Sequence, residues 1–370
     1  MVMPGYWPII GLCQYRIQDG AKALWIEKMA LGWLFGELNP GGIAMVKNGK
    51  MYFFHCLSPV HIGAGQGIGD IELPIVRERT TEWPYVPGSS VKGVHRRYYK
   101  RLEEGNKANG ITSAWTDAVF GRSGDKDMDD SNGIDEGNAG ALVFTDSRIL
   151  AFPVASVQGV FAYVTSPMAL RRIVQDSKAI DLDMPDPGIS QLQEVLDKDP
   201  KAAFKCPRSK LVVPGGEAND KEIWLDEFQF EAQYDLEPLA EWADWAAWQL
   251  FPEREMEIER SNWIRRLVVV SDEAFHYFVT MCCEITPRIR LKQETKTVEK
   301  GALWKEEYIP SEAILYGLVW CDKVYASGTE LSPDEVLRNL HGNVPLQLGA
   351  NVSVGKGRVR YLLTGEAAKR

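Results

Sequence analysis

The sequence lacks the features that define several common classes of protein. Its six cysteines include no CxxC pair, and no cysteine–histidine cluster has the spacing of a zinc site. Such cysteine usage is typical of reduced thiols in the cytoplasm. No apolar run approaches the ~20 residues that span a bilayer, and the start does not resemble a signal peptide. We therefore expect a cytoplasmic protein with no membrane partner and no metal held by the chain alone.

An excess of positive charge is also absent. The 370 residues carry 42 Lys and Arg against 51 Asp and Glu, which gives a formal net charge of -9. This total argues against indiscriminate binding to nucleic acid. It is compatible with a local basic groove, because binding depends on where the charge lies. The length suffices for two modest domains or one elaborated domain.

Residues 57–97 form the most informative stretch of the chain. Four glycines alternate along residues 63–69, shortly after His61. Because glycine has no side chain, such a loop allows another backbone to come close. Asp70 and Glu72 follow two residues apart, so in an extended segment both carboxylates point to one face.

A basic helix is predicted directly after this stretch. Ser89 and Ser90 are suitable N-caps, and apolar residues then recur at helical spacing to give a buried face. The opposite face carries only basic residues, namely Lys92, Arg96, Arg97, Lys100 and Arg101. The segment thus combines free backbone amides at a helix start with a positive surface, and a polyanion is a ligand that uses both.

A second glycine-rich loop precedes the last predicted strand. It contains Gly355, Lys356 and Gly357. The spacing of its glycines does not match a P-loop, and residues 63–69 do not match a dinucleotide-binding turn. We therefore expect neither loop to bind a nucleotide cofactor, although both suit backbone contacts with phosphate groups.

The candidate catalytic side chains have structural alternatives. His61 is either a general base or, more commonly for a lone histidine, a residue that fixes the loop by hydrogen bonds. Asp70 and Glu72 are either solvated surface carboxylates or acids that steer a 2'-hydroxyl proton or a metal ion. Glu306 and Tyr308, beside a predicted hairpin, either pack and form salt bridges or belong to the site.

The order of predicted elements favours an α+β fold with an antiparallel sheet. Strands outnumber helices and the helices follow them at irregular intervals, unlike a repeating βαβ chain. Residues 51–370 form the body in this interpretation. Residues 1–50 are either an N-terminal extension or lie upstream of a natural start near Met45 or Met51.

Four stretches together resemble the RAMP superfamily of CRISPR proteins, and in particular the repeated backbone subunit of the Cmr (type III-B) effector complex. They spread over about residues 51–361 and read LSPVHIGAGQGIGDIELPIVRERTTEWPYVPGSSVKG, FTDSRILAFPVASVQGVFAYVTSP, VEKGALWKEEYIP and LGANVSVGKGRV. Each stretch alone is a weak signal, but their combination in this order is specific.

The resemblance implies a fold and an activity. The fold is an RRM-like (ferredoxin-like) palm with inserted helical and loop segments and a thumb β-hairpin at about 288–310. Several copies line up along a CRISPR RNA with other Cmr-type RAMP subunits. In this family the subunit cuts target RNA at regular intervals as an endoribonuclease, with a divalent metal ion, Mg or Mn. A structural subunit without nuclease activity, and a processing endoribonuclease of the same superfamily, are the alternatives.

The resemblance also assigns roles to residues. The nucleolytic aspartate of the family aligns with Glu72, and Asp70 lies two positions earlier. Either Glu72 substitutes, or Asp70 takes the role, or this chain binds RNA without cutting it. His61, Glu306 and Tyr308 match other positions near the cleavage site. The residues expected to hold the CRISPR RNA are Gly88, Ser89, Ser90, Lys92, Arg96, Gly355, Lys356 and Gly357.

Overall fold

The computed structural model describes residues 46, 48–65, 71–105, 111–122, 137–214, 221–324 and 331–365. The chain divides into two compact units, Met1–Val46 and Lys47–Arg370, and the described residues from 48 onward belong to the second. Residues 1–45 of the predicted extension and Asp70 lie outside the described part. Among the described helices, none has both the length and the apolar character needed to cross a membrane.

One sheet of thirteen strands organises the second unit. Its strands are β1 (Lys50–Cys56), β2 (Tyr85–Val86), β5 (Leu142–Phe144), β6 (Ser147–Ser156), β7 (Val160–Thr165), β8 (Ala202–Lys205), β9 (Val212–Pro214), β10 (Lys221–Leu225), β11 (Phe228–Asp235), β12 (Leu267–Val269), β15 (Ile314–Cys321), β16 (Val344–Gln347) and β17 (Arg358–Leu363). The main path runs β16-β17-β1-β15-β6-β7-β12-β8-β11-β10-β9. The α+β class is therefore confirmed. The sheet is mixed, because β11 pairs with β8 and β12 with β7 in parallel.

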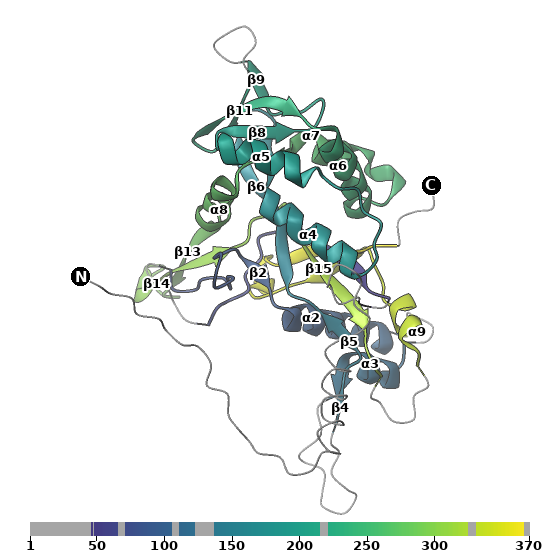
Figure 1. Cartoon of the computed structure of the whole chain (residues 1–370). Helices are drawn as coiled ribbons and strands as arrows, with labels where there is room; N and C mark the ends of the chain where they lie inside the picture. The colour runs from purple at the N-terminus through teal and green to yellow at the C-terminus, as the bar shows by residue number, and fades with distance from the viewer. Residues whose placement is uncertain are drawn as a thin grey trace, which may run out of the picture. The chain divides into compact units, whose positions relative to one another are not determined.

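The helices cover different ends of this sheet (Figure 1). They are α2 (Gly88–Glu104), α3 (Ser113–Phe120), α4 (Pro167–Ala179), α5 (Ile189–Lys198), α6 (Glu237–Leu250), α7 (Glu257–Arg266), α8 (Asp272–Met281) and α9 (Pro333–Arg338), with short 3-10 turns η1 (Arg254–Met256) and η2 (Val352–Val354). The helix α2 packs against α3 and β5, whereas α6 packs against α7 and β17, and α7 against β7. A small ladder of β3 (Gly121–Arg122) and β4 (Asn138–Ala139) adjoins α3.

The strand β1 is an interior strand of the sheet, the third along its main path. It pairs antiparallel with β15 on one side and β17 on the other, and its aromatic residues Tyr52, Phe53 and Phe54 are fully buried. Both faces of β1 are therefore covered, which explains its continuous apolar sequence. Along the order β17-β1-β15-β6, each strand is antiparallel to its neighbour. The helix α2 lies between β1 and β6 in the chain, and α9 between β15 and β17.

The basic helix begins differently from the prediction. Pro87 is its N-cap, so Ser89 and Ser90 lie in the first turn and the prediction that they cap the helix is wrong. The first amide, that of Gly88, donates instead to Asp146 Oδ1 at 2.8 Å. A Cβ atom at Gly88 would collide with a backbone carbonyl oxygen of the neighbouring strand, so close packing explains the glycine.

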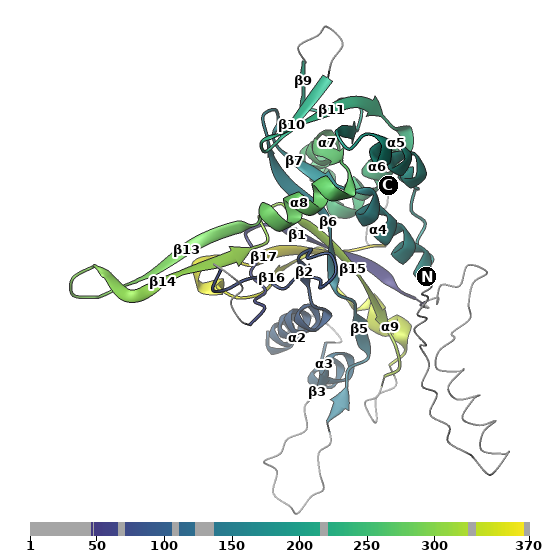
Figure 2. The ribbon, with the colours of Figure 1, turned by 60° about the vertical axis from the view of Figure 1, so that its left-hand side comes forward.

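A separate hairpin extends away from the sheet (Figure 2). It consists of β13 (Glu284–Leu291) and β14 (Val298–Tyr308), paired antiparallel. Strands were predicted on both sides of residues 293–301, and these strands form the hairpin. Its two faces differ in character. Ile289 and Leu303 stand opposite each other on an exposed apolar face, while Arg288 and Trp304 form the next pair, on the other face.

Candidate nucleic-acid interface and cleavage site

The segment that carries Glu72 lies against the base of this hairpin. Leu73 pairs with β14 in parallel through two backbone hydrogen bonds: its N–H donates to Lys305 O at 3.2 Å, and its carbonyl accepts from Glu307 N at 3.0 Å. On the other side, Val76 N donates to Ile62 O at 2.8 Å. The segment is therefore fixed between the hairpin and the chain that follows β1.

Glu72 is exposed, and one of its oxygens is engaged. Its Oε2 accepts the backbone N–H of Lys305 at 2.7 Å, and this hydrogen bond holds the pKa of Glu72 below its usual value. The carboxylate is thus ionised at neutral pH and its direction is set by β14. Asp70 is the other candidate for the same role, and it lies outside the described residues.

His61 is buried at the same place. Its Nδ1 lies 2.7 Å from the carbonyl oxygen of Glu307, so Nδ1 carries the donated proton, and in the neutral ring Nε2 holds the lone pair. The imidazole also stands edge-on to the ring of Tyr308, with centroids 5.5 Å apart. The structural interpretation of His61 is therefore correct in part, because this hydrogen bond fixes the ring. Its Nε2 is left with an acceptor lone pair.

Glu306 and Tyr308 form a buried polar network with the second glycine-rich loop. Tyr308 donates its hydroxyl proton to Glu306 Oε2, which also accepts from Arg288 Nε at 3.1 Å and Asn351 Nδ2 at 3.0 Å. Burial acts to raise the pKa of Glu306, but the hydrogen bonds it accepts, first of all from Tyr308, hold that pKa below its usual value. Trp304 Nε1 donates to the other carboxylate oxygen at 2.9 Å. Glu306 and Tyr308, the pair predicted as a secondary site, therefore belong to one hydrogen-bonded network around the charged carboxylate of Glu306.

The second loop closes on itself. The amides of Gly355, Lys356 and Gly357 donate to Val352 O, Asn351 O and Pro59 O at 3.1, 3.3 and 2.8 Å, respectively. None of these three amides is thus free to bind a phosphate group.

The side chain of Lys356 turns toward the site. Its Nζ lies 4.6 Å from the ring centroid of Tyr308 and 3.9 Å from Glu284 Oε2. The contribution of this loop is therefore one cation beside Glu306 and Tyr308, and not the row of amides that its glycines suggested.

Of the two predicted cations of α2, Lys92 is engaged elsewhere. Lys92 Nζ donates to Leu142 O at 2.8 Å and to Gly140 O at 3.4 Å, and burial lowers its pKa. Arg96 is half-buried, whereas Ser89 is exposed. Lys92 contacts the strands behind α2, while Lys356 contacts the hairpin. Lys92 and Lys356, both expected to hold the CRISPR RNA, therefore have different surroundings.

A different basic cleft lies between α2 and the strands β16 and β17. Its volume is about 190 Å³, and its lining includes three arginines, Arg97, Arg101 and Arg358. Their guanidinium groups form no hydrogen bond or ion pair with the described residues. Arg97 and Arg101 are four residues apart, so they share one face of the helix. Lys92 and Arg96 are also four residues apart, so spacing alone does not distinguish the two pairs.

A short stretch of chain, from Leu57 to His61, connects the cleft to the candidate cleavage site. Leu57 lines the cleft, its N–H donates to Arg358 O at 2.9 Å, and four residues later the chain reaches His61. At about 3.3 Å per extended residue, this stretch spans at most roughly 13 Å. An anionic chain bound in the cleft is therefore close to Glu72 and the hairpin.

The described residues contain no ready-made metal site. Within the described ranges, no cluster of three or more His, Cys, Asp or Glu side chains is arranged to hold an ion. Glu72 offers an exposed carboxylate oxygen at this place. The chain's own described donors therefore do not suffice to bind a divalent ion without ligands from a substrate.

Comparison with known proteins identifies the family. Residues 53–360 match the model of the RAMP superfamily. The CRISPR system Cmr endoribonuclease Cmr4 of Pyrococcus furiosus is 32% identical over 309 residues, which cover 84% of this chain and 93% of that one. The CRISPR system CMR subunit Cmr4 of Saccharolobus solfataricus is 21% identical over 319 residues, covering 84% and 94%.

A solved structure shows the same fold. The crystal structure of oligomeric Cmr4 from Pyrococcus furiosus aligns with a TM-score of 0.57 and 26% identity, covering 85% of this chain and 97% of that one. Sequence and structure thus agree over nearly the whole length of these relatives. The chain belongs to the RAMP superfamily and, within it, to the Cmr4 family of type III-B CRISPR systems.

Proposed function

We propose that this chain is a backbone subunit of a cytoplasmic type III-B effector complex, that it binds CRISPR RNA, and that it cleaves complementary target RNA at regular intervals. It does so beside further copies of itself and other Cmr-type RAMP subunits. The observation that carries the proposal is the position of Glu72. An ionised, exposed carboxylate is fixed at the base of a projecting hairpin by the same strand, β14, that holds His61, and a cleft of three arginines lies beyond the short stretch that leads to His61.

The four central strands correspond to an RRM-like palm. Their order, β17-β1-β15-β6, and the connections through α2 and α9 are those of a ferredoxin-like unit. The hairpin β13–β14 takes the part of the thumb. It separates guide from target at intervals and brings one target phosphate against Glu72.

The arginine cleft holds the guide backbone. Arg97, Arg101 and Arg358 supply sequence-independent contacts with phosphate groups, which suit a protein that must accept any guide. This assignment replaces the contacts through the amides of Gly88 and residues 355–357, since these amides are already bonded within the chain.

Cleavage proceeds by attack of the target 2'-oxygen on the adjacent phosphorus. The bond from phosphorus to the 5'-oxygen breaks, so the products are a 2',3'-cyclic phosphate and a 5'-hydroxyl that takes up a proton from water. Glu72 steers the hydroxyl proton, because it is ionised and exposed. The lone pair of His61 Nε2 is the second acceptor at the site, since Nδ1–H is donated to Glu307 O. Lys356, beside Tyr308, balances the negative charge of the phosphate.

A divalent ion, Mg or Mn, is part of this proposal. Mg²⁺ usually keeps several waters and binds through one or two carboxylates together with substrate phosphates. Glu72 and a target phosphate would supply such ligands, and the ion would then stabilise charge on the phosphate. No step of the reaction is derived through it, because the described residues form no site of their own.

The decisive experiment removes the carboxylate from the assembled complex. Target RNA cleavage and target affinity are measured for Glu72→Ala, for Asp70→Ala and for the unmodified complex. Glu72→Ala should abolish cutting with unchanged target binding. Glu227→Ala, which removes an exposed carboxylate in the turn between β10 and β11, is the matched control. Cutting that survives in Glu72→Ala and stops in Asp70→Ala would transfer the role to Asp70.

A scaffold without nuclease activity is the second candidate. It is favoured by the hydrogen bond from Lys305 N to Glu72, which already occupies one carboxylate oxygen. Glu72 also has one methylene more than the family's aspartate, and displacement of about 1 Å can cost catalysis heavily. An unmodified complex that binds target RNA tightly and never cuts it would establish this function instead.

A further inference from the structure

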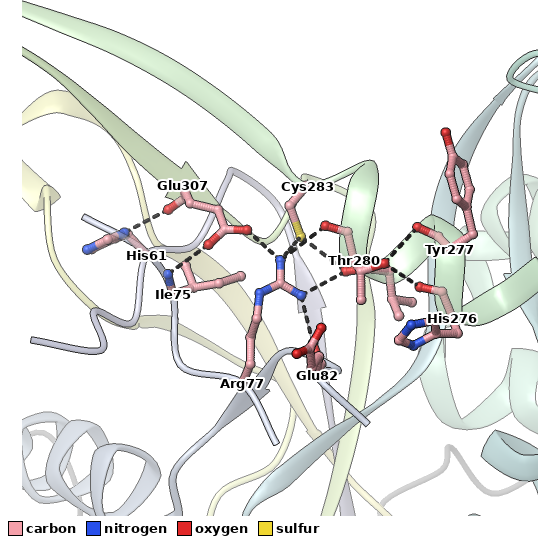
Figure 3. A network of polar contacts seen from close by, with 10 residues as sticks. His61, Ile75, Arg77, Glu82, His276, Tyr277, Thr280, Cys283 and Glu307 are labelled. Carbon is pink, nitrogen blue, oxygen red and sulfur yellow. Dashed lines mark hydrogen bonds and ion pairs between the residues drawn. The ribbon is translucent and has the colours of Figure 1, made fainter. Parts of the chain in front are cut away.

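Glu307 is the residue at which the hairpin, His61 and the segment carrying Glu72 meet (Figure 3). It lies near the end of β14, and its side chain is only 6% exposed. Its main chain contacts both candidate regions: the N–H donates to Leu73 O at 3.0 Å, and the carbonyl accepts from His61 Nδ1 at 2.7 Å. The position of the segment that carries Glu72 and the position of His61 therefore both depend on the backbone of Glu307.

The side chain of Glu307 holds the same segment a second time. One carboxylate oxygen, Oε2, accepts the backbone N–H of Ile75 at 3.0 Å. The other, Oε1, forms a short ion pair with Arg77. Both bonds lie three to five residues beyond Glu72 along the chain. The segment is thus fixed against the hairpin by the main chain and by the carboxylate together.

Arg77 extends this contact to α8. Its guanidinium group donates to Val279 O at 3.2 Å and Thr280 O at 3.4 Å, and also to Glu82 O at 2.8 Å. These helix carbonyls belong to the last turn of α8, where a cation is favourable. Because β13 begins three residues after α8, the ion pair ties both strands of the hairpin to the segment of Glu72.

Neighbouring carboxylates at the end of β14 have different partners. Glu306 and Glu307 point to opposite faces of the strand. Glu306 joins the network with Tyr308 and Arg288, whereas both oxygens of Glu307 are bonded to Ile75 and Arg77. Because its side chain is buried and both oxygens already accept hydrogen bonds within the chain, Glu307 is not placed to act on the RNA directly.

We propose that Glu307 is a positioning residue for target cleavage. It sets the place of Glu72 and His61 relative to the hairpin, so that the acid meets the phosphate that the hairpin displaces. This inference rests on the proposed endoribonuclease function, and it adds the residue on which the geometry of that function depends. Arg77 acts with it by anchoring the same carboxylate to α8.

The first test compares Glu307→Ala with Glu307→Gln in the assembled complex. Glutamine retains an acceptor for the Ile75 amide, whereas alanine removes it. A displacement of about 1 Å costs roughly 100-fold in rate, so single-turnover cleavage at saturating target should fall by that factor in Glu307→Ala. Glu307→Gln should recover most of the rate. The Kd for target RNA should not change, which a general loss of structure would not allow.

The matched control is Glu253→Ala. Glu253 is also paired with an arginine, Arg360, and it accepts a hydrogen bond from Asn343. Its removal breaks a comparable ion pair away from residues 71–77, and it should leave the cleavage rate unchanged. An equal loss of rate in Glu253→Ala would overturn the proposal.

The second test does not depend on cleavage. Amide hydrogen exchange of residues 71–77 in the full chain should accelerate in Glu307→Ala and stay unchanged in Glu253→Ala. If the unmodified complex does not cut RNA, the proposed function fails, and exchange still decides whether Glu307 holds the segment. Unchanged exchange, or faster exchange with an undiminished rate, refutes the inference. Should the alanine chain not assemble, Arg77→Met replaces it with the same expected outcomes.

Discussion

The arginine cleft gives the sharpest quantitative prediction. Arg97, Arg101 and Arg358 line it, and each is changed singly to Gln. For single-stranded nucleic acid, each neutralised phosphate contributes about −0.7 to the slope of log K against log salt. Each substitution should therefore make the slope shallower by about 0.7 if its arginine contacts one phosphate.

This slope corresponds to a measurable change in affinity. When salt rises from 50 to 200 mM, one phosphate contact accounts for about a 2.6-fold loss of RNA affinity, and three contacts account for about an 18-fold loss. The triple variant should thus bind CRISPR RNA more weakly at low salt and lose this share of its salt dependence. Fluorescence anisotropy with labelled CRISPR RNA across a salt series measures both quantities.

Two comparisons make this prediction refutable. Arg171→Gln removes a cation that instead bonds to Gln193 on the surface of α4 and α5, and it should leave the slope unchanged. Lys92→Gln should also leave it unchanged, because that ammonium is bonded to backbone carbonyls. An unchanged slope in all three arginine variants, or an equal shift in Arg171→Gln, would show that the guide does not lie in this cleft.

Three further predictions concern stability, acid and metal. Lys92→Met should lower the free energy of unfolding by about 1–3 kcal/mol, since Leu142 O loses a charged donor, with CRISPR RNA affinity intact; denaturant titration and anisotropy check this. The pKa of Glu306 is held low in the folded state, so its stabilisation is present above the unfolded value of about 4.3 and is lost as pH falls through the folded value. The stability deficit of Glu306→Gln should therefore shrink in acid denaturation profiles, and a constant deficit would contradict this. Chelation with EDTA should stop target cleavage without releasing target RNA, and Mg or Mn should restore it; undiminished cutting in EDTA would remove the ion from the mechanism.

Local sequence patterns predicted the elements well. The helical spacing of Val91 and Val94 and the turn at Pro87 located α2 to within a few residues. The two short strands predicted on either side of residues 293–301 located the hairpin. In both cases the signal lies within about ten residues, and backbone preference together with burial of one face decides the outcome.

The partners of charged side chains were not predictable in the same way. Lys92 has the spacing of an exposed helix residue, yet its acceptors lie 48 and 50 residues further along the chain. Glu307 meets Arg77 across 230 residues. Periodicity reports which face a residue occupies and not which distant strand covers that face, so these roles become visible only in the fold.

Helix capping shows the same limit on a smaller scale. Ser89 and Ser90 have the side chains of good caps, but Asp146 on a neighbouring connection already accepts the Gly88 amide. Pro87 is therefore the N-cap of the helix, two residues before Ser89. A tertiary acceptor thus replaced the local one that the sequence offered.

The length of β14 has a mechanical consequence. The strand has eleven residues, so at about 3.4 Å per residue it reaches roughly 35 Å, from a solvated tip to the buried ring of Tyr308. It is one continuous strand, and its buried end carries Glu306 and Glu307. A neighbouring molecule that rotates the tip of the hairpin would therefore also shift Glu306 and Glu307 at the other end of the strand. Binding at the tip can in this way change the chemistry at the base of the hairpin.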